Sequence, residues 1–63
     1  MYDKVRDEMK KQGMSTNKLS FRAEIAQSDL SCALNGKKPF YPAWRRRVAE
    51  ALGVPEDTLF PKQ

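Results

Sequence analysis

Glycines and prolines divide this chain into short stretches. Gly13, Gly36 and Gly53 each follow a stretch of helical apolar spacing, in the position after a helix end where glycine is favoured. Pro42 and Pro55 stand where helices can begin again, because the first turn of a helix has no partner for the N–H that proline lacks. No stretch shows a useful length of the period-two alternation of a β-strand. The chain is therefore expected to be all-α.

Apolar residues at helical spacing complete a division into five helices. Leu30, Ala33 and Leu34 share one face, because they are spaced i, i+3 and i+4. Similar spacing marks the other core candidates, which are Tyr2, Val5, Met9, Leu19, Ala23, Ile25, Trp44, Val48, Ala51 and Leu52. The expected helices cover residues 3–12, 16–23, 27–35 and 42–52, with a short last helix within 54–60. Ser15 is placed to cap the second helix. These helices are expected to form one compact bundle, a single domain spanning residues 1–63.

Basic charge is concentrated in the middle of the chain. The whole protein carries a formal net charge of +4. Residues 18–47 hold seven basic and two acidic side chains, and this segment alone carries +5. A central basic segment on a small domain favours a polyanionic partner, most often nucleic acid. The alternative is a basic protein without such a partner.

The cysteine and histidine content argues against catalysis and metal binding. Cys32 is the only cysteine and histidine is absent, so neither a metal-ligand cluster nor a Cys–His pair is available. The sequence also has no glycine-rich phosphate loop. We therefore expect no enzyme activity, no cofactor and no small-molecule ligand. A lone thiol, a charged start and the lack of a long apolar run favour a cytoplasmic protein without signal peptide or membrane helix.

The expected third helix has an unusual polar face. It collects short, uncharged polar side chains, and two lysines follow directly. These residues are Gln27, Ser28, Ser31, Cys32, Asn35, Lys37 and Lys38. An ordinary solvated face would more often mix lysine and glutamate. Neutral hydrogen-bonding groups beside positive charge suit a DNA major groove, where cations hold phosphates and amides or hydroxyls read base edges.

Together, these features resemble the lambda-repressor-like, Cro-type helix-turn-helix family of phage and bacterial regulators. The resemblance covers nearly the whole chain and rests on the joint order and spacing of several motifs. They are Leu19, Ala23, Ile25 and Leu30, then Leu34-Asn35-Gly36-Lys37, and the segment AEALGVPEDTLF at 49–60. The resemblance implies a five-helix bundle with a helix-turn-helix at about residues 16–35. It also implies that the third helix binds double-stranded operator DNA, often in a two-fold dimer.

The resemblance also implies roles for individual residues. The implied base-reading residues are Gln27, Ser28 and Cys32, with Ser31 nearby. The implied phosphate contacts are Thr16, Asn17, Asn35, Lys37 and Lys38. A homodimer, if formed, is expected to be weak, with candidate contacts at Val54, Leu59 and Phe60. The plainer alternatives are a solvated polar residue for Gln27 and a half-buried filler for Cys32.

Two positions depart from the family pattern, and further roles stay open. Ser20 stands where the family usually has alanine, and Glu24 where it has glycine or asparagine. A left-handed Glu24 would cost about 1 kcal/mol or more, unless the turn adopts another geometry. Phe21 either folds back onto the core edge or is exposed at a partner surface. The run Arg45–Arg47 cannot face one surface, because three consecutive helical positions span about 200°.

The sequence predicts a sequence-specific DNA-binding transcriptional regulator, namely a repressor of phage or mobile-element type. The alternative is a protein-interaction module, such as an antitoxin or a regulatory subunit, that uses the same helical fold. In that alternative, Phe21, Phe40 and Phe60 form an exposed apolar surface. Phe40 and Tyr41 are otherwise expected to form a lid over Trp44 rather than platforms for base stacking, and Trp44 is placed in the core.

Overall fold

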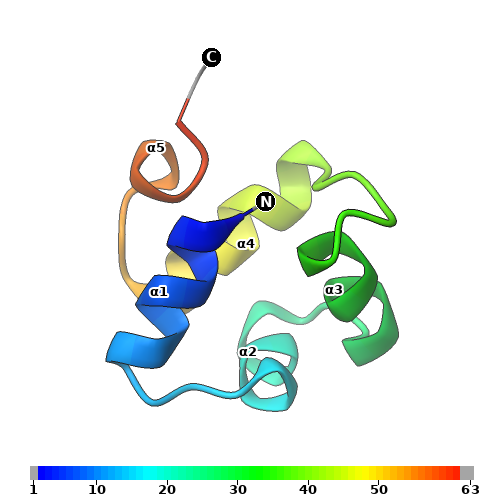
Figure 1. Ribbon diagram of the computed structural model, residues 1–63, viewed down its shortest axis with the longest axis horizontal. Helices are drawn as coiled ribbons and strands as arrows, with labels where there is room; N and C mark the ends of the chain where they lie inside the picture. Colours follow the sequence, from blue (N-terminus) through cyan, green and yellow to red (C-terminus); the bar gives the residue numbers. More distant parts are fainter. Residues whose placement is uncertain (1, 62–63) are drawn as a thin grey trace.

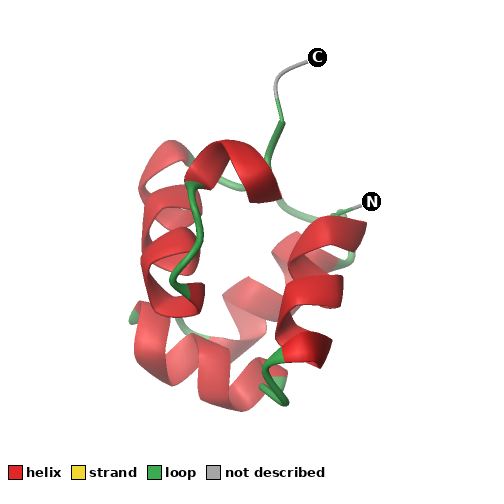
Figure 2. Cartoon of the chain, turned by 90° about the vertical axis from the view of Figure 1, so that its left-hand side faces the viewer, coloured by secondary structure: helices red, strands yellow, loops and turns green. Residues whose placement is uncertain are grey.

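The computed structural model describes residues 2–61, and this part of the chain contains five helices and no strand (Figures 1 and 2). They are α1 (Asp3–Lys11), α2 (Thr16–Ala23), α3 (Gln27–Leu34), α4 (Pro42–Leu52) and α5 (Glu56–Leu59). The expected all-α class is confirmed. The bounds of α2 and α4 agree with the sequence prediction to the residue, whereas α1 and α3 each end one residue earlier than expected.

Four helices end in the same backbone motif. A left-handed residue follows the helix, and the next N–H donates to a carbonyl five residues earlier, as in a Schellman motif. The N···O distances are 2.8 Å for Met14 to Met9, 3.0 Å for Ile25 to Ser20, 2.8 Å for Lys37 to Cys32 and 3.1 Å for Val54 to Ala49. The left-handed residues are Gly13, Glu24, Gly36 and Gly53. Glu24 is therefore the one place where this repeated motif lacks glycine.

Side chains reinforce some of these helix ends. The Ser15 hydroxyl accepts a hydrogen bond from the Lys18 N–H at 3.1 Å, so the expected cap of α2 is confirmed. The Gln12 amide donates to the Leu52 carbonyl at 2.7 Å, which ties the end of α1 to the end of α4. The first bond is a local cap, and the second joins residues 40 positions apart in the sequence.

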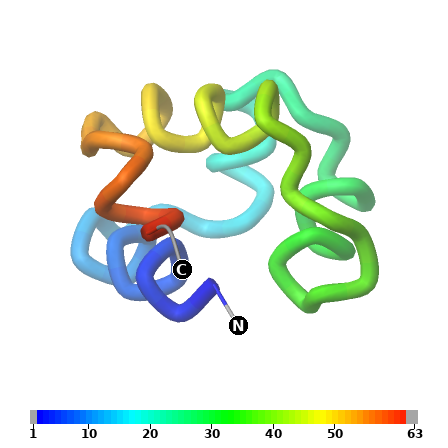
Figure 3. Tube along the Cα trace, turned by 90° about the horizontal axis from the view of Figure 1, so that it is seen from above, coloured from blue at the N-terminus to red at the C-terminus, as the bar shows by residue number. Residues whose placement is uncertain are grey.

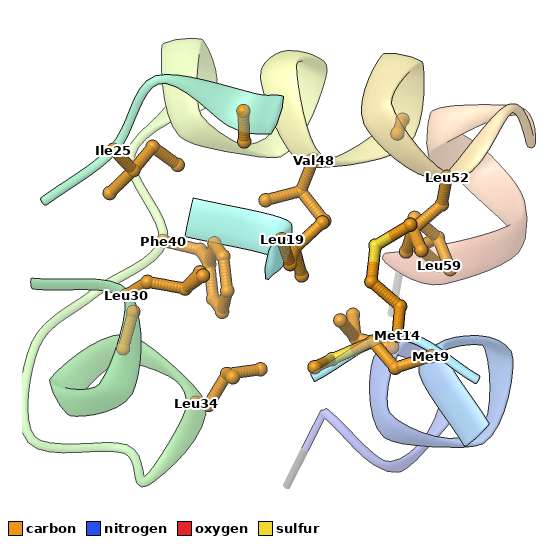
Figure 4. Packing of buried hydrophobic residues seen from close by; sticks show 14 residues of the cluster. Met9, Met14, Leu19, Ile25, Leu30, Leu34, Phe40, Val48, Leu52 and Leu59 are labelled. Carbon is orange, nitrogen blue, oxygen red and sulfur yellow. The ribbon is translucent and has the colours of Figure 1, made fainter. Parts of the chain in front are cut away.

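The five helices surround one apolar core (Figure 4). Val5, Leu19, Leu30 and Val48 are fully enclosed, and they come from four different helices. The remaining buried apolar residues are Met9, Met14, Ala23, Ile25, Ala33, Leu34, Phe40, Ala49, Leu52 and Leu59. Ten of the thirteen expected core positions are buried, whereas Tyr2, Trp44 and Ala51 are only partly buried. The helices have 4 to 11 residues, and helices this short are only marginally stable in isolation. Packing in the shared core therefore stabilises them.

Helix α4 is the longest helix in residues 2–61. Helix α2 packs against both α3 and α4, and α5 packs against α4 and α1. Figure 3 shows α3 on one side of the molecule, with α1 and α5 on the other. Helix α3 therefore lies away from the short C-terminal helix α5.

The aromatic residues pack differently from the prediction. Phe40 is only 3% exposed, and its ring lies 4.7 Å from Tyr2 and 5.0 Å from Phe60, centre to centre. It therefore fills the gap between the N-terminus and α5 and is not a lid over Trp44. Tyr41 does pack on Trp44, edge to face at 4.7 Å. Trp44 itself is only partly buried and packs against the margin of the core.

The stripe of α4 also needs one correction. Ala49 is buried and Ala51 is only partly buried, where Ala51 was the expected core residue. The buried arc of α4, against which α2 and α5 pack, therefore runs through Val48, Leu52 and Ala49.

Candidate nucleic-acid interface

Helix α3 presents a polar face directly opposite its core face. Leu30, Ala33 and Leu34 are buried, as expected, whereas Gln27 and Ser28 are exposed. Counting about 100° per residue, the exposed arc runs through Ser31, Asn35, Ser28 and Cys32, with Gln27 at its edge in the first turn. Ser31 and Cys32 are partly buried on this arc. The structure therefore brings all four expected base-reading residues onto one helix surface.

The start of α3 is held by packing rather than by a capping side chain. Ala26 precedes the helix and offers no side-chain hydrogen bond, as the sequence predicts. Ile25, just before it, is buried and only 6% exposed. This anchor and the contact between α2 and α3 hold the first turn of α3 in place, so Gln27 and Ser28 project from a supported backbone.

The connection between α2 and α3 contains a strained residue. Glu24 has φ 57° and ψ 42°, in the left-handed region that disfavours a Cβ. Of the two alternatives considered for this position, the strained turn is therefore the one adopted. Arg47 of α4 donates its Nη1 to the Glu24 carbonyl at 3.3 Å and helps to hold this backbone. Ser20, the other departure, is buried, and its hydroxyl donates to the Asn17 carbonyl at 2.6 Å.

An ion pair between Lys38 and Asp29 balances two opposite charges beside the polar face of α3. Lys38 Nζ lies 2.7 Å from Asp29 Oδ1, so the loop after α3 folds back to the first turn of that helix. The hydrogen bond that Lys38 donates to Asp29, together with the negative charge of Asp29, holds the pKa of Lys38 above its ordinary value of 10.5. Lys38 is therefore charged and paired at neutral pH. Asp29, the one acidic residue of α3, is in turn neutralised by Lys38.

The C-terminal end of α3 is capped from α1. Arg6 Nη2 donates to the Asn35 side-chain Oδ1 at 2.8 Å and to the Leu34 carbonyl at 3.3 Å. This contact between Arg6 and the end of α3 was not predicted from the sequence. A usable signal existed, since Arg6 follows Tyr2 by four residues and precedes Met9 by three. It therefore borders the apolar face of α1.

The expected phosphate contacts lie around the same pair of helices. Lys37 and Asn35 are exposed just after α3, and Asn17 is exposed in the first turn of α2, where Thr16 is partly buried. These residues therefore belong to two helices that pack against each other, or directly follow one of them. No ion pair of Lys37 is found within residues 2–61.

The candidate dimer residues lie elsewhere. Val54 and Phe60 are partly buried near α5, and Leu59 is only 2% exposed. Leu59 therefore belongs to the core, which corrects its expected place in a dimer contact. Its side chain is needed to close the bundle between α5 and α1.

The three arginines of α4 separate, as the helical spacing predicts. Arg45 Nε donates to the Phe40 carbonyl at 3.0 Å, and Arg47 reaches Glu24. Arg46 instead borders a shallow apolar hollow beside Val54 and Pro55. Two of the three guanidinium groups therefore hold backbone in place, and they do not form one basic patch.

Phe21 is the prominent exposed apolar side chain, with 86% of its surface accessible. This resolves its position, because it points away from the core side of α2. Phe40 is buried and Phe60 packs against it, so the exposed surface of three phenylalanines expected for the alternative function is not formed.

Within the described residues there is no helix long and apolar enough to cross a membrane. In the same part of the chain, no three potential ligand side chains gather where a metal ion could be held. No protein-family model, curated protein or solved structure matches this sequence.

Proposed function

We propose that this protein is a sequence-specific DNA-binding regulator, in which α2 and α3 act as a helix-turn-helix of the lambda-repressor type. The observation that carries the proposal is the exposed face of α3, whose members are polar, uncharged and short. Its single carboxylate, Asp29, is neutralised by Lys38 at 2.7 Å. A surface that lacks free negative charge and is rich in hydrogen-bonding groups matches the edges of bases in a major groove.

In the proposed complex, the first turn of α3 reads bases. Gln27 carries an amide that can bond an adenine through two hydrogen bonds, which is worth about 1–3 kcal/mol of discrimination. The Ser28 hydroxyl can donate to or accept from either base of a pair. Ser31 and Cys32 lie one turn further along α3, and the Cys32 thiol offers a small apolar surface to a thymine methyl.

Phosphate contacts fix this docking. Lys37 and Asn35 follow α3 directly, and Thr16 and Asn17 begin the helix that packs on it. Cations and amide donors at these positions contact the backbone on either side of the groove and set the depth of α3. Lys38 contributes more weakly, because Asp29 already holds its ammonium.

The regulator is proposed to act by occupying its operator. A two-fold dimer would place two copies of α3 about one helical turn of DNA apart, roughly 34 Å. With Leu59 buried, Val54 and Phe60 are the remaining candidates for a weak contact between subunits. Dimerisation is then expected mainly on DNA.

Selection from a random DNA pool tests the proposal. The protein is bound to labelled duplexes of random sequence at two salt concentrations, and the retained DNA is sequenced. A palindrome among the retained sequences, with binding that falls steeply as salt rises, is the expected result. One enriched unpaired half-site would indicate a monomeric reader.

Two other outcomes contradict the proposal. Salt-sensitive binding without enrichment would leave only a basic domain. No binding at low salt would favour a protein-interaction module, for which the exposed Phe21 would be the first residue to test.

A further inference from the structure

The hydrogen bond with Arg6 fixes which end of the Asn35 side-chain amide faces the protein. Its side-chain oxygen, Oδ1, accepts from Arg6 Nη2 at 2.8 Å. A guanidinium group has only donors, so the amide oxygen of Asn35, not its NH₂ group, must face it. The same Arg6 nitrogen donates to the Leu34 carbonyl at 3.3 Å, which places the guanidinium at the end of α3.

The bond has a consequence for the other half of the amide. Once Oδ1 is engaged, the group left for an external ligand is the NH₂ of Asn35, which carries two donors and no acceptor. Phosphate oxygens accept hydrogen bonds and cannot donate them. Asn35 is exposed and lies two residues before the exposed Lys37, so a donor and a cation adjoin each other after α3.

We propose that Arg6 is a positioning residue for phosphate recognition, which turns Asn35 into a donor aimed at the nucleic-acid backbone. This inference rests on the proposed function and deepens it. It assigns the backbone contact after α3 to a pair of residues from two distant parts of the chain, 29 positions apart. Arg6 acts through Asn35, and it also stabilises the carbonyl end of α3, where a positive charge is favourable.

Asn35→Asp separates recognition from folding. Aspartate keeps an acceptor for Arg6 and strengthens that bond by its charge, so the melting temperature is expected to stay close to that of the unmodified protein. It removes the donor and presents a negative charge to phosphate. Affinity for a fluorescein-labelled duplex of mixed sequence is therefore expected to fall about tenfold or more.

Asn35→Ala tests whether Asn35 contacts phosphate as an uncharged hydrogen-bond donor, in contrast to a cation such as Lys37. Its affinity is expected to fall by about fivefold to tenfold, while the slope of log affinity against log salt concentration stays unchanged. Lys37→Ala is the matched comparison, because loss of a cation reduces that slope by about one. A purely structural role of Asn35 would not produce this difference.

A double-mutant cycle tests the link to Arg6. Arg6→Gln removes a charge and the donor-only partner together, so Lys4→Gln, on the same helix, serves as the charge control. In the Asn35→Ala background, Arg6→Gln is expected to lower affinity no more than Lys4→Gln does. In the unmodified background, Arg6→Gln is expected to lower DNA affinity about threefold to tenfold more than Lys4→Gln does. Arg6→Lys should restore most of this factor, because an ammonium group also only donates.

The outcomes separate this inference from the proposed function. If the unmodified protein binds the duplex but Asn35→Asp binds equally well, the role of Arg6 and Asn35 is wrong and the DNA-binding function stands. Additive effects of Arg6→Gln and Asn35→Ala would also overturn the positioning role. If the unmodified protein does not bind DNA even at low salt, both proposals fail.

Discussion

Single residues on α3 and beside it divide into those that read bases and those that hold phosphates. Gln27 and Ser28 are exposed in the first turn of α3, and Lys37 is exposed after its end. Base contacts discriminate between sequences, whereas phosphate contacts hold every sequence alike. Substitutions at these positions should therefore change different properties.

Gln27→Ala is predicted to reduce sequence preference, whereas Lys37→Ala should weaken binding to all duplexes similarly. The loss at Gln27 should amount to about 1–3 kcal/mol at one base position, because a bidentate contact is removed. Parallel selections from a random pool, with both variants and the unmodified protein, measure this. Unchanged preference in Gln27→Ala would show that the proposed docking of α3 is wrong.

Glu24→Gly is predicted to stabilise the protein by about 1 kcal/mol, because glycine adopts the left-handed backbone without a Cβ penalty. The observed φ of 57° is the basis of this expectation. Thermal unfolding followed by circular dichroism measures the change.

Gly53→Ala is the matched control for Glu24→Gly. It places a Cβ at a left-handed position with φ +71° where no neighbouring atom lies within 4 Å. It should therefore lose about 1 kcal/mol through backbone strain alone. The expectation for Glu24 is contradicted if both variants, Glu24→Gly and Gly53→Ala, are less stable than the unmodified protein. The Glu24 side chain would then stabilise the fold by more than its left-handed backbone destabilises it.

At the scale of elements, α3 is held at both ends by groups from other segments. Lys38 in the following loop reaches back to Asp29, and Arg6 of α1 reaches its C-terminal end. Its first turn has no side-chain cap, so packing through Ile25 takes that role. The orientation of α3 therefore depends on α1, α2 and the loop together.

Asp29→Asn is predicted to increase DNA affinity by about threefold to tenfold. It should also steepen the slope of log affinity against log salt concentration by about one, because one more counterion is released on binding. The substitution removes a negative charge from α3 and releases the Lys38 ammonium from its 2.7 Å pair. Fluorescence anisotropy across a salt series measures both quantities. Lys38→Gln is the opposite control, and it should weaken binding slightly. Equal affinities for all three proteins would place this ion pair away from the DNA.

For the whole molecule, stability rests on one core shared by all five helices. The chain has 63 residues, and a domain of this size has only roughly 3–5 kcal/mol of hydrophobic stability to spare. Fully enclosed side chains are therefore critical, since no disulfide can form within a chain that has one cysteine.

Leu30→Ala is predicted to unfold most of the protein at room temperature. Leu30 is completely buried, and removal of such a leucine costs about 2–5 kcal/mol, which is close to the whole expected stability. Urea titration and circular dichroism test this, with Lys4→Ala as a surface control expected to change stability by about 0.5 kcal/mol or less. A cooperative transition near that of the unmodified protein would contradict the single-core description.

The division into helices could be predicted because its causes are local. Gly13, Gly36 and Gly53 end helices in the observed left-handed conformation, and Pro42 begins α4. Apolar spacing placed the buried face of α3 correctly, because side-chain direction in a helix follows from residue number. The polar face opposite it was predicted by the same reasoning.

Long-range pairing was decided only by the tertiary structure. Arg6 meets Asn35 across 29 positions and Phe40 joins the rings of Tyr2 and Phe60, and no local pattern specifies such partners. The physical reason is that periodicity selects which face of a helix is buried, whereas the packing of helices selects which groups meet. The sequence by itself therefore determined the five helices and the polar face of α3. Packing decided the partners of Asn35 and Lys38, and with them which groups on this face remain available to a ligand.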